Sequence, residues 1–134
     1  MTIELAKDHL DEIISHAQES YPIECCGLMA GRNGRVERVY RGRNIDPHPS
    51  IRYRMDDLQV LQALREIEDQ GRDLVAIYHS HPHSVALPSA TDRAQAFYPD
   101  ARHVIVSLQD REAPVVRVFR IVDGRVSEER VVIR

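Results

Sequence analysis

The apolar run LVAIY, residues 74–78, limits how this chain can fold more than any other feature. An unbroken apolar run of strand length is typical of a central strand that is covered on both faces. The polar residues HSHPHS, 79–84, follow directly and therefore lie at the carboxyl end of that strand. We expect a sheet with this run near its centre.

Two longer segments show the periodicity of amphipathic helices. The first extends from about residue 6 to residue 20, and the second begins at a capping Asp56 or Asp57 and ends at Gly71. In each segment the apolar residues recur every three or four positions, so that they share one face. These apolar residues are Leu10, Ile13, Ile14 and Ala17 in the first helix and Leu58, Leu61, Leu64 and Ile67 in the second.

Asn-Gly and Asp-Gly pairs mark two hairpins between β-type runs. Asn33-Gly34 lies in the first hairpin, and Asp123-Gly124 lies between the last two predicted strands. Further strands are predicted at residues 51–55, 103–108, 114–122 and 125–134. Together the segments predict one α+β domain over residues 1–134, with a mixed, largely antiparallel sheet flanked by helices.

Charge and hydropathy exclude two classes of partner. The 18 basic and 21 acidic residues are spread through the chain and give a net charge of -3, which does not fit a nucleic-acid-binding surface. No apolar span is long enough for a membrane helix or a secretory signal. The two cysteines, Cys25 and Cys26, are adjacent and too close for a relaxed disulfide. We therefore expect a protein of the reducing cytoplasm.

The alternation of the residues that follow the central run predicts a metal site. His79 and His81 point to the same side of a strand, about 6.5–7 Å apart along it, and can converge on one ion. Pro82 ends the hydrogen-bonded ladder because it has no N–H to donate. A catalytic zinc commonly has three protein ligands and one open position. The third ligand can be His83, Asp92 or a cysteine.

A purely structural interpretation of the same residues is also available. Ser89-x-x-Asp92 after Pro88 fits a capping box at the start of a short helix over residues 89–97. A His-x-His pair at a strand end is also found in proteins as packed or surface histidines. The remaining histidines show no partner pattern, and we expect them at the surface; they are His9, His16, His48 and His103.

Five polar residues at fixed relations, taken together, resemble the signature of the JAMM (MPN+) metalloproteases. They are Glu24 in PIECCGLMAG, His79 and His81 in HSHP, and Ser89 and Asp92 in SATD. The similarity covers most of the chain. It implies the cytidine-deaminase-like JAMM/MPN fold and one zinc ion per chain, bound by His79, His81 and Asp92. It also implies Glu24 as the general base and acid and Ser89 as the group that stabilises the oxyanion. We expect Ser80, on the opposite side of the strand, to be structural.

The resemblance further implies an activity. Prokaryotic members of this kind resemble enzymes that hydrolyse the amide bond after the C-terminal Gly-Gly of a small ubiquitin-like or sulfur-carrier protein. The chain is too short for the long insertions with which eukaryotic deubiquitinases hold ubiquitin chains, so a small carrier is the expected substrate. We expect loop 44–55 and the apolar residues Val85, Ala86 and Leu87 to hold it. The oligomeric state, monomer or homodimer, stays open.

Two other functions are compatible with the residues alone. Cys25 or Cys26 can act as the nucleophile of a cysteine hydrolase with one of the histidines as base, although no third member is recognisable. A non-catalytic MPN-type scaffold is the other alternative, since relatives that have lost the metal ligands serve as structural subunits. The presence of Glu24 and of all the ligand positions argues against the scaffold.

Overall fold

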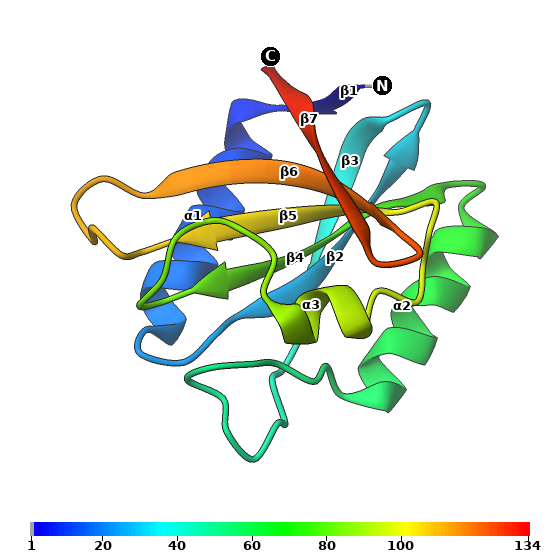
Figure 1. Ribbon diagram of the computed structural model, residues 1–134. Helices are drawn as coiled ribbons and strands as arrows, with labels where there is room; N and C mark the ends of the chain where they lie inside the picture. Colours follow the sequence, from blue (N-terminus) through cyan, green and yellow to red (C-terminus); the bar gives the residue numbers. More distant parts are fainter. Residues whose placement is uncertain (1) are drawn as a thin grey trace.

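Seven strands form a closed mixed sheet with three helices around it (Figure 1). The computed structural model describes residues 2–134, and within them the strand order is β1-β3-β2-β4-β5-β6-β7, with β7 paired to β1. The strands are β1 Thr2–Leu5, β2 Cys26–Arg32, β3 Arg35–Arg41, β4 Asp73–His81, β5 Arg102–Ser107, β6 Val115–Val122 and β7 Arg125–Ile133. The helices are α1 Lys7–Ser20, α2 Asp57–Asp69 and α3 Ala90–Ala94.

The first strand, β1, was not predicted, and it changes the architecture. It pairs in parallel with β7 over residues 2–5 and with β3 at Glu4, so that it joins the two edges of the sheet. The prediction of an open sheet flanked by helices was therefore wrong, although the α+β content and the largely antiparallel pairing are confirmed. Closure removes the two exposed edges, which are a liability of open sheets.

The local signals in the sequence give the expected elements at most positions. Asn33 and Gly34 have φ of 54° and 76°, and Asp123 and Gly124 have φ of 52° and 76°. Positive φ at both central residues is the geometry of type I′ hairpins. Residues 51–55 do not form the predicted strand, because the segment from Asn44 to Met55 is a loop with a single bridge between these two residues.

The apolar run lies in β4, between β2 and the parallel strand β5, as expected for a central strand. One face of β4 packs against α1, where the hydroxyl of Tyr78 is 2.7 Å from Nδ1 of the buried His16. On the other face, Ile77 joins the apolar cluster beneath α2. The expected surface position of His16 was therefore wrong. Because side chains alternate along the strand, the face that carries Ile77 also carries His79 and His81 at its carboxyl end.

Asp56 caps the helix α2, and its carboxylate accepts from the backbone N–H groups of Leu58 and Gln59 at 3.0 and 3.3 Å. Gly71 follows the helix with a φ of 67°, which fits a glycine after a helix end. No helix within residues 2–134 combines the length and the apolar character that crossing a membrane requires.

Candidate metal centre

Three side chains meet at the carboxyl end of β4. The Nε2 atom of His79, the Nε2 atom of His81 and the Oδ2 atom of Asp92 form a triangle in which each side is 3.1 Å. The two rings are buried, with 1% and 4% of their residues' surface exposed. The structure therefore brings the two predicted histidines together with Asp92. His83, the other histidine considered as a ligand, lies outside this group and is exposed.

The hydrogen bonds of His81 leave its inner nitrogen available to a metal. Its Nδ1 lies 2.8 Å from the carbonyl oxygen of Val85. Since a carbonyl can only accept, Nδ1 carries the proton, and the lone pair of the neutral ring is on Nε2. The ring of His79 stacks on Tyr53 with 4.7 Å between the centroids, which fixes its plane.

Asp92 reaches the triangle from the first turn of α3. Ser89 caps this helix: its hydroxyl accepts from the backbone N–H of Asp92 at 3.0 Å, and Oδ2 of Asp92 accepts from the N–H of Ser89 at 2.9 Å. The predicted capping box is thus confirmed, and the same carboxylate faces both histidines. Capping and metal binding are compatible here because the box holds the carboxylate in a fixed direction.

Charge and burial have opposite effects on Asp92. Burial disfavours its ionised form, but the contacts with His79 and His81 outweigh burial and hold its pKa well below the usual value. For His81, burial alone would lower the pKa, whereas Asp92 and the Val85 carbonyl raise it overall. The carboxylate is therefore ionised at neutral pH and provides the negative charge that a bound cation needs.

Glu24 lies beside the histidine pair. It precedes β2, and because Cys26 of β2 is paired with His79 of β4, its carboxylate comes within 4.8 Å of the ligating nitrogens of both histidines. Only 4% of the residue is exposed, and Oε1 is buried without a hydrogen-bond partner in residues 2–134. Burial is the largest cause that raises the pKa of Glu24 to about 8. A buried carboxyl without a partner, aimed at two histidines, is typical of a functional site.

Asn44 positions Glu24 and was not identified from the sequence. Its side-chain N–H donates to the backbone carbonyls of Glu24 and Arg52 at 3.0 and 3.1 Å. Its Oδ1 accepts from the backbone N–H groups of Asp46 and Arg54 at 3.0 and 3.1 Å. One side chain therefore ties loop 44–55 to the segment that carries Glu24. Asn44 is preceded by β3 and followed by a proline-rich stretch, which indicated only an irregular connection.

The donor set fits zinc. Tetrahedral ligands about 2.0–2.1 Å from zinc lie about 3.3 Å from one another, close to the 3.1 Å sides of the triangle. Imidazole nitrogens and a carboxylate oxygen are usual zinc ligands, and three of them leave a fourth position for water or substrate. The unpartnered Oε1 of Glu24 lies on the side from which a water can be deprotonated.

A family model described as prokaryotic homologs of the JAB domain matches residues 6–122. The chain belongs to this family. The match begins just before α1 and ends with β6, and it contains all five residues of the proposed signature. It confirms the resemblance that the sequence motifs indicated.

Two relatives and one solved structure are similar over most of this JAB domain. A CysO-cysteine peptidase of Mycobacterium tuberculosis is 40% identical over 126 residues, which cover 92% of this chain and 86% of the relative. A desampylase of Haloferax volcanii is 37% identical over 115 residues, which cover 81% of this chain and 83% of the relative. The solution structure of a Desulfitobacterium hafniense protein has a TM-score of 0.88 at 35% identity and covers 100% of this chain and 93% of its own.

The cysteines of this JAB domain are placed as structural residues. Both are buried and free, and the backbone N–H of Cys25 donates to Oγ of Ser80 at 2.8 Å. Burial is the main cause that raises the pKa of Cys25 to about 11 and that of Cys26 to about 12. A nucleophilic cysteine requires a lowered pKa, so the structure argues against the cysteine hydrolase. It agrees with a structural Ser80.

A cleft of about 560 Å³ borders the metal centre of the JAB domain. Loop residues 46–55 and α2 line it together with residues 95–98, and Tyr53 connects it to His79. His103 lies at its inner wall and is only 4% exposed, so its expected surface position was wrong. Burial and the nearby His79 lower the pKa of His103 to about 4, and its ring is therefore neutral at pH 7.

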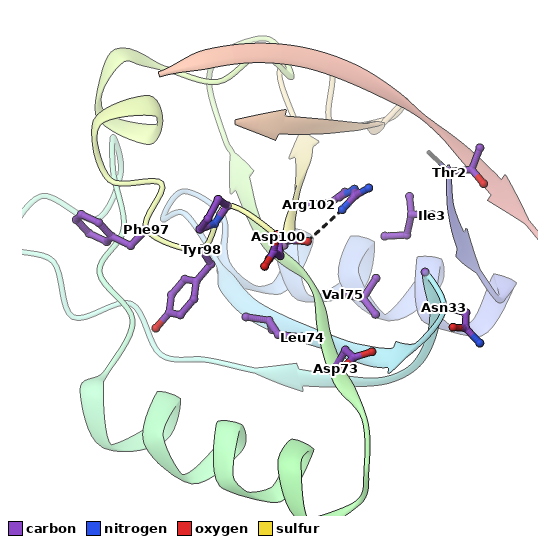
Figure 2. Close-up of a pocket in the computed structure, with 13 residues that line it drawn as sticks. Thr2, Ile3, Asn33, Asp73, Leu74, Val75, Phe97, Tyr98, Asp100 and Arg102 are labelled. Atoms are coloured by element: carbon purple, nitrogen blue, oxygen red, sulfur yellow. Dashed lines mark hydrogen bonds between the residues drawn. The ribbon is translucent and has the colours of Figure 1, made fainter. Parts of the chain in front are cut away.

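A larger cleft, of about 690 Å³, opens at the other end of β4 (Figure 2). Its wall includes Asp73 and Tyr98, and Nη1 of Arg102 donates to the carbonyl of Asp100 there at 3.0 Å. Asp73 precedes His79 by six residues, or about 20 Å of extended strand. This cleft is therefore separate from the metal centre of the JAB domain.

The loop after the histidine pair, residues 82–88, is held close to the metal centre. Ser107 donates through Oγ to the carbonyl of Ser84 at 2.6 Å, and the Val85 carbonyl contacts His81. Val85 and Leu87 are exposed, as expected for a substrate contact, but Ala86 is buried against the core. The expectation of three exposed apolar residues was therefore wrong at one position.

Replacing Glu24 by glutamine is expected to stabilise the metal-free protein at pH 8 by about 1–3 kcal/mol, because it removes the cost of burying a carboxylate. A raised folded-state pKa stabilises the protein below the unfolded pKa of about 4.3, and this stabilisation is lost as the pH rises through about 8. The advantage of Glu24→Gln is therefore small near pH 4.5 and grows up to pH 8. Urea titrations of chelator-treated protein at several pH values measure it. An equal difference at every pH contradicts the buried, unpartnered carboxyl.

Proposed function

We propose that this protein is a zinc-dependent peptidase or isopeptidase that hydrolyses the amide bond after the C-terminal Gly-Gly of a small ubiquitin-like or sulfur-carrier protein. The observation that carries the proposal is the 3.1 Å triangle of His79, His81 and Asp92 with the buried carboxyl of Glu24 beside it. The two free cysteines, which form no disulfide, support a cytoplasmic location for this protein, which we treat as one domain over residues 1–134.

The names of the relatives support the substrate class. The Mycobacterium tuberculosis relative is a CysO-cysteine peptidase, and the Haloferax volcanii relative is a desampylase. A further relative, from Thermus thermophilus, is a probable TtuB-protein conjugate cleaving protease and is 45% identical over 87 residues. These names describe removal of a group that is joined to a carrier. The absence of long insertions, already visible in the 134 residues, also favours a small carrier.

In this proposal His79, His81 and Asp92 hold the zinc ion. Zinc bound there lowers the pKa of water towards 7 and polarises the carbonyl of the scissile amide. Glu24 accepts the proton of the attacking water and returns it to the leaving amine nitrogen. Although burial raises the pKa of Glu24, a cation bound beside it favours its ionised form, which is the form that a base requires.

Ser89 is proposed to stabilise the negative charge that develops on the carbonyl oxygen. Its oxygen accepts from the N–H of Asp92, so its own hydroxyl proton is free to donate to the substrate. Its side chain is exposed and lies in the same turn as the ligand Asp92. Charge and donor geometry of this kind commonly contribute a large share of catalysis.

Replacing Ser89 by alanine is expected to lower kcat about 100- to 1000-fold, because one donor to the oxyanion is lost. Loss of the helix cap also costs about 1 kcal/mol of stability. Zinc content measured on the same sample separates the two effects, since the variant should keep one zinc per chain. Ser89→Thr, which retains both hydroxyl and cap, is the matched control and should keep most of the activity. Unchanged kcat in Ser89→Ala excludes this role.

The test of the function combines metal analysis with cleavage. Purified protein should contain about one zinc per chain by mass spectrometry, and it should release a group joined after the Gly-Gly of a ubiquitin-like carrier. Chelation should stop cleavage, and added zinc should restore it. Cleavage that survives full removal of the metal would contradict the proposal. Tight carrier binding without any turnover in the zinc-loaded protein would support the scaffold alternative instead.

A further inference from the structure

Three loops meet at the end of the barrel that carries the metal centre (Figure 1). Residues 21–25 follow α1 and contain Glu24, residues 82–88 follow β4, and residues 108–114 connect β5 to β6. The third loop is tied to the site because the backbone N–H of Leu108 donates to the carbonyl of His81 at 3.0 Å. Side chains at the contacts of these loops are therefore close to the site along the chain.

Tyr21 holds one side chain from each of the other two loops. The guanidinium carbon of Arg111 lies 4.0 Å from the centre of the Tyr21 ring. His83 approaches the same ring edge-on, with 5.3 Å between centroids and an interplanar angle of 70°. An arginine stacked on an aromatic ring is restrained but keeps its fork of N–H donors. Both Arg111 and His83 are exposed, while Tyr21 is partly buried.

Arg111 has no carboxylate partner in residues 2–134. Other arginines of the chain, such as Arg41 with Glu12 and Arg117 with Glu128, form ion pairs at 2.8 and 2.5 Å. The neighbouring carboxylate of Asp110 accepts instead from the backbone N–H of Glu112 at 3.1 Å. The guanidinium of Arg111 is thus held in place by an aromatic ring and presents its donors to the solvent. Its geometry matches the two oxygens of a carboxylate.

The metal centre lies between this cluster and the cleft of about 560 Å³. The cleft adjoins His79 through Tyr53, whereas the cluster of Tyr21, His83 and Arg111 adjoins the loop that follows His81. The cleft is lined mainly by apolar residues and is long enough for the tail of a carrier. A substrate chain that crosses the site from the cleft therefore leaves it on the side of the cluster.

We propose that Arg111, supported by Tyr21 and His83, binds the α-carboxylate of a single C-terminal amino acid that is released from the carrier. This inference rests on the proposed function and names its leaving group. A single amino acid carries its carboxylate within one residue, about 3.5 Å of extended chain, of the scissile bond. A lysine side chain in an isopeptide bond carries no carboxylate at this position. The cluster therefore selects carriers that end in one added residue over protein conjugates.

The test compares two substrates that differ in one group. A ubiquitin-like carrier is extended after its Gly-Gly by one cysteine, either as the free acid or as the carboxamide. Wild type should cleave the free acid with a kcat/KM about 10-fold or more above that of the amide, since a charge-assisted hydrogen bond is lost in the amide. Arg111→Gln should lower kcat/KM about 10-fold for the acid and leave the amide unchanged. Arg125→Gln, at the β6–β7 turn, is the matched control and should preserve the preference.

Each other outcome has a defined meaning. Equal cleavage of acid and amide by wild type, or a preserved acid preference in Arg111→Gln, overturns the carboxylate site while leaving the proposed function intact. Faster cleavage of a carrier joined to a lysine side chain overturns it as well. If the zinc-loaded wild type cleaves none of these substrates, the proposed function fails. Binding of the two carriers to Glu24→Gln then decides the inference: about 10-fold tighter binding of the acid supports it, and equal binding overturns it.

Discussion

Glu24→Gln is expected to reduce kcat about 100- to 10,000-fold while the protein keeps its zinc. Glutamine has nearly the same shape but cannot accept a proton at neutral pH, so the loss measures general acid and base catalysis. The residue is not part of the 3.1 Å triangle, and the ligand set is therefore unchanged by the substitution. Steady-state cleavage of an extended carrier, with zinc content measured on the same preparation, checks this result.

The control for this prediction is Glu68→Gln, which makes the same chemical change on the exposed surface of α2. It should leave both turnover and zinc content at the wild-type level. Retention of more than about one tenth of wild-type kcat by Glu24→Gln removes Glu24 as the general base. Loss of zinc from the same variant gives it a different role, as a ligand in place of a base.

Asp92→Asn is expected to weaken zinc binding at least about 100-fold and to abolish activity at ordinary zinc concentrations. The carboxylate provides the only negative charge in the triangle, and a neutral amide cannot replace it. Asparagine still accepts a hydrogen bond from the N–H of Ser89, so the cap of α3 is retained. Competition with a zinc chelator of known affinity measures the change.

Thermal unfolding of the metal-free protein distinguishes metal binding from capping. If Asp92 only stabilises α3, then Asp92→Asn should bind zinc like wild type. His48→Ala changes an exposed histidine of loop 44–55 and should affect neither property. Equal zinc affinity in Asp92→Asn and wild type means that the aspartate caps the helix and that another group completes the metal site.

Much of the candidate site could be predicted from residues that are close in the sequence. The alternation of a strand places His79 and His81 on one side, and the capping pattern fixes Ser89 and Asp92 relative to each other. These relations follow from backbone geometry over a few residues, so they hold whatever the rest of the chain does. Motif spacing then connected the two pairs with Glu24 through a resemblance to a family, not through a derivation of the contacts.

The sequence alone determined the helices, the two type I′ hairpins and the position of the histidine pair at the end of a buried strand, because stereochemistry and hydrophobic periodicity act locally. Only the tertiary structure decided which distant segments meet. The pairing of Cys26 with His79 brings Glu24 to the histidines, and the pairing of β1 with β3 and β7 closes the barrel. The hydrogen bonds of Asn44 and the contact of Arg111 with Tyr21 also join segments that are far apart in the chain. Such contacts depend on the register and packing of the whole sheet, which no short stretch of sequence specifies.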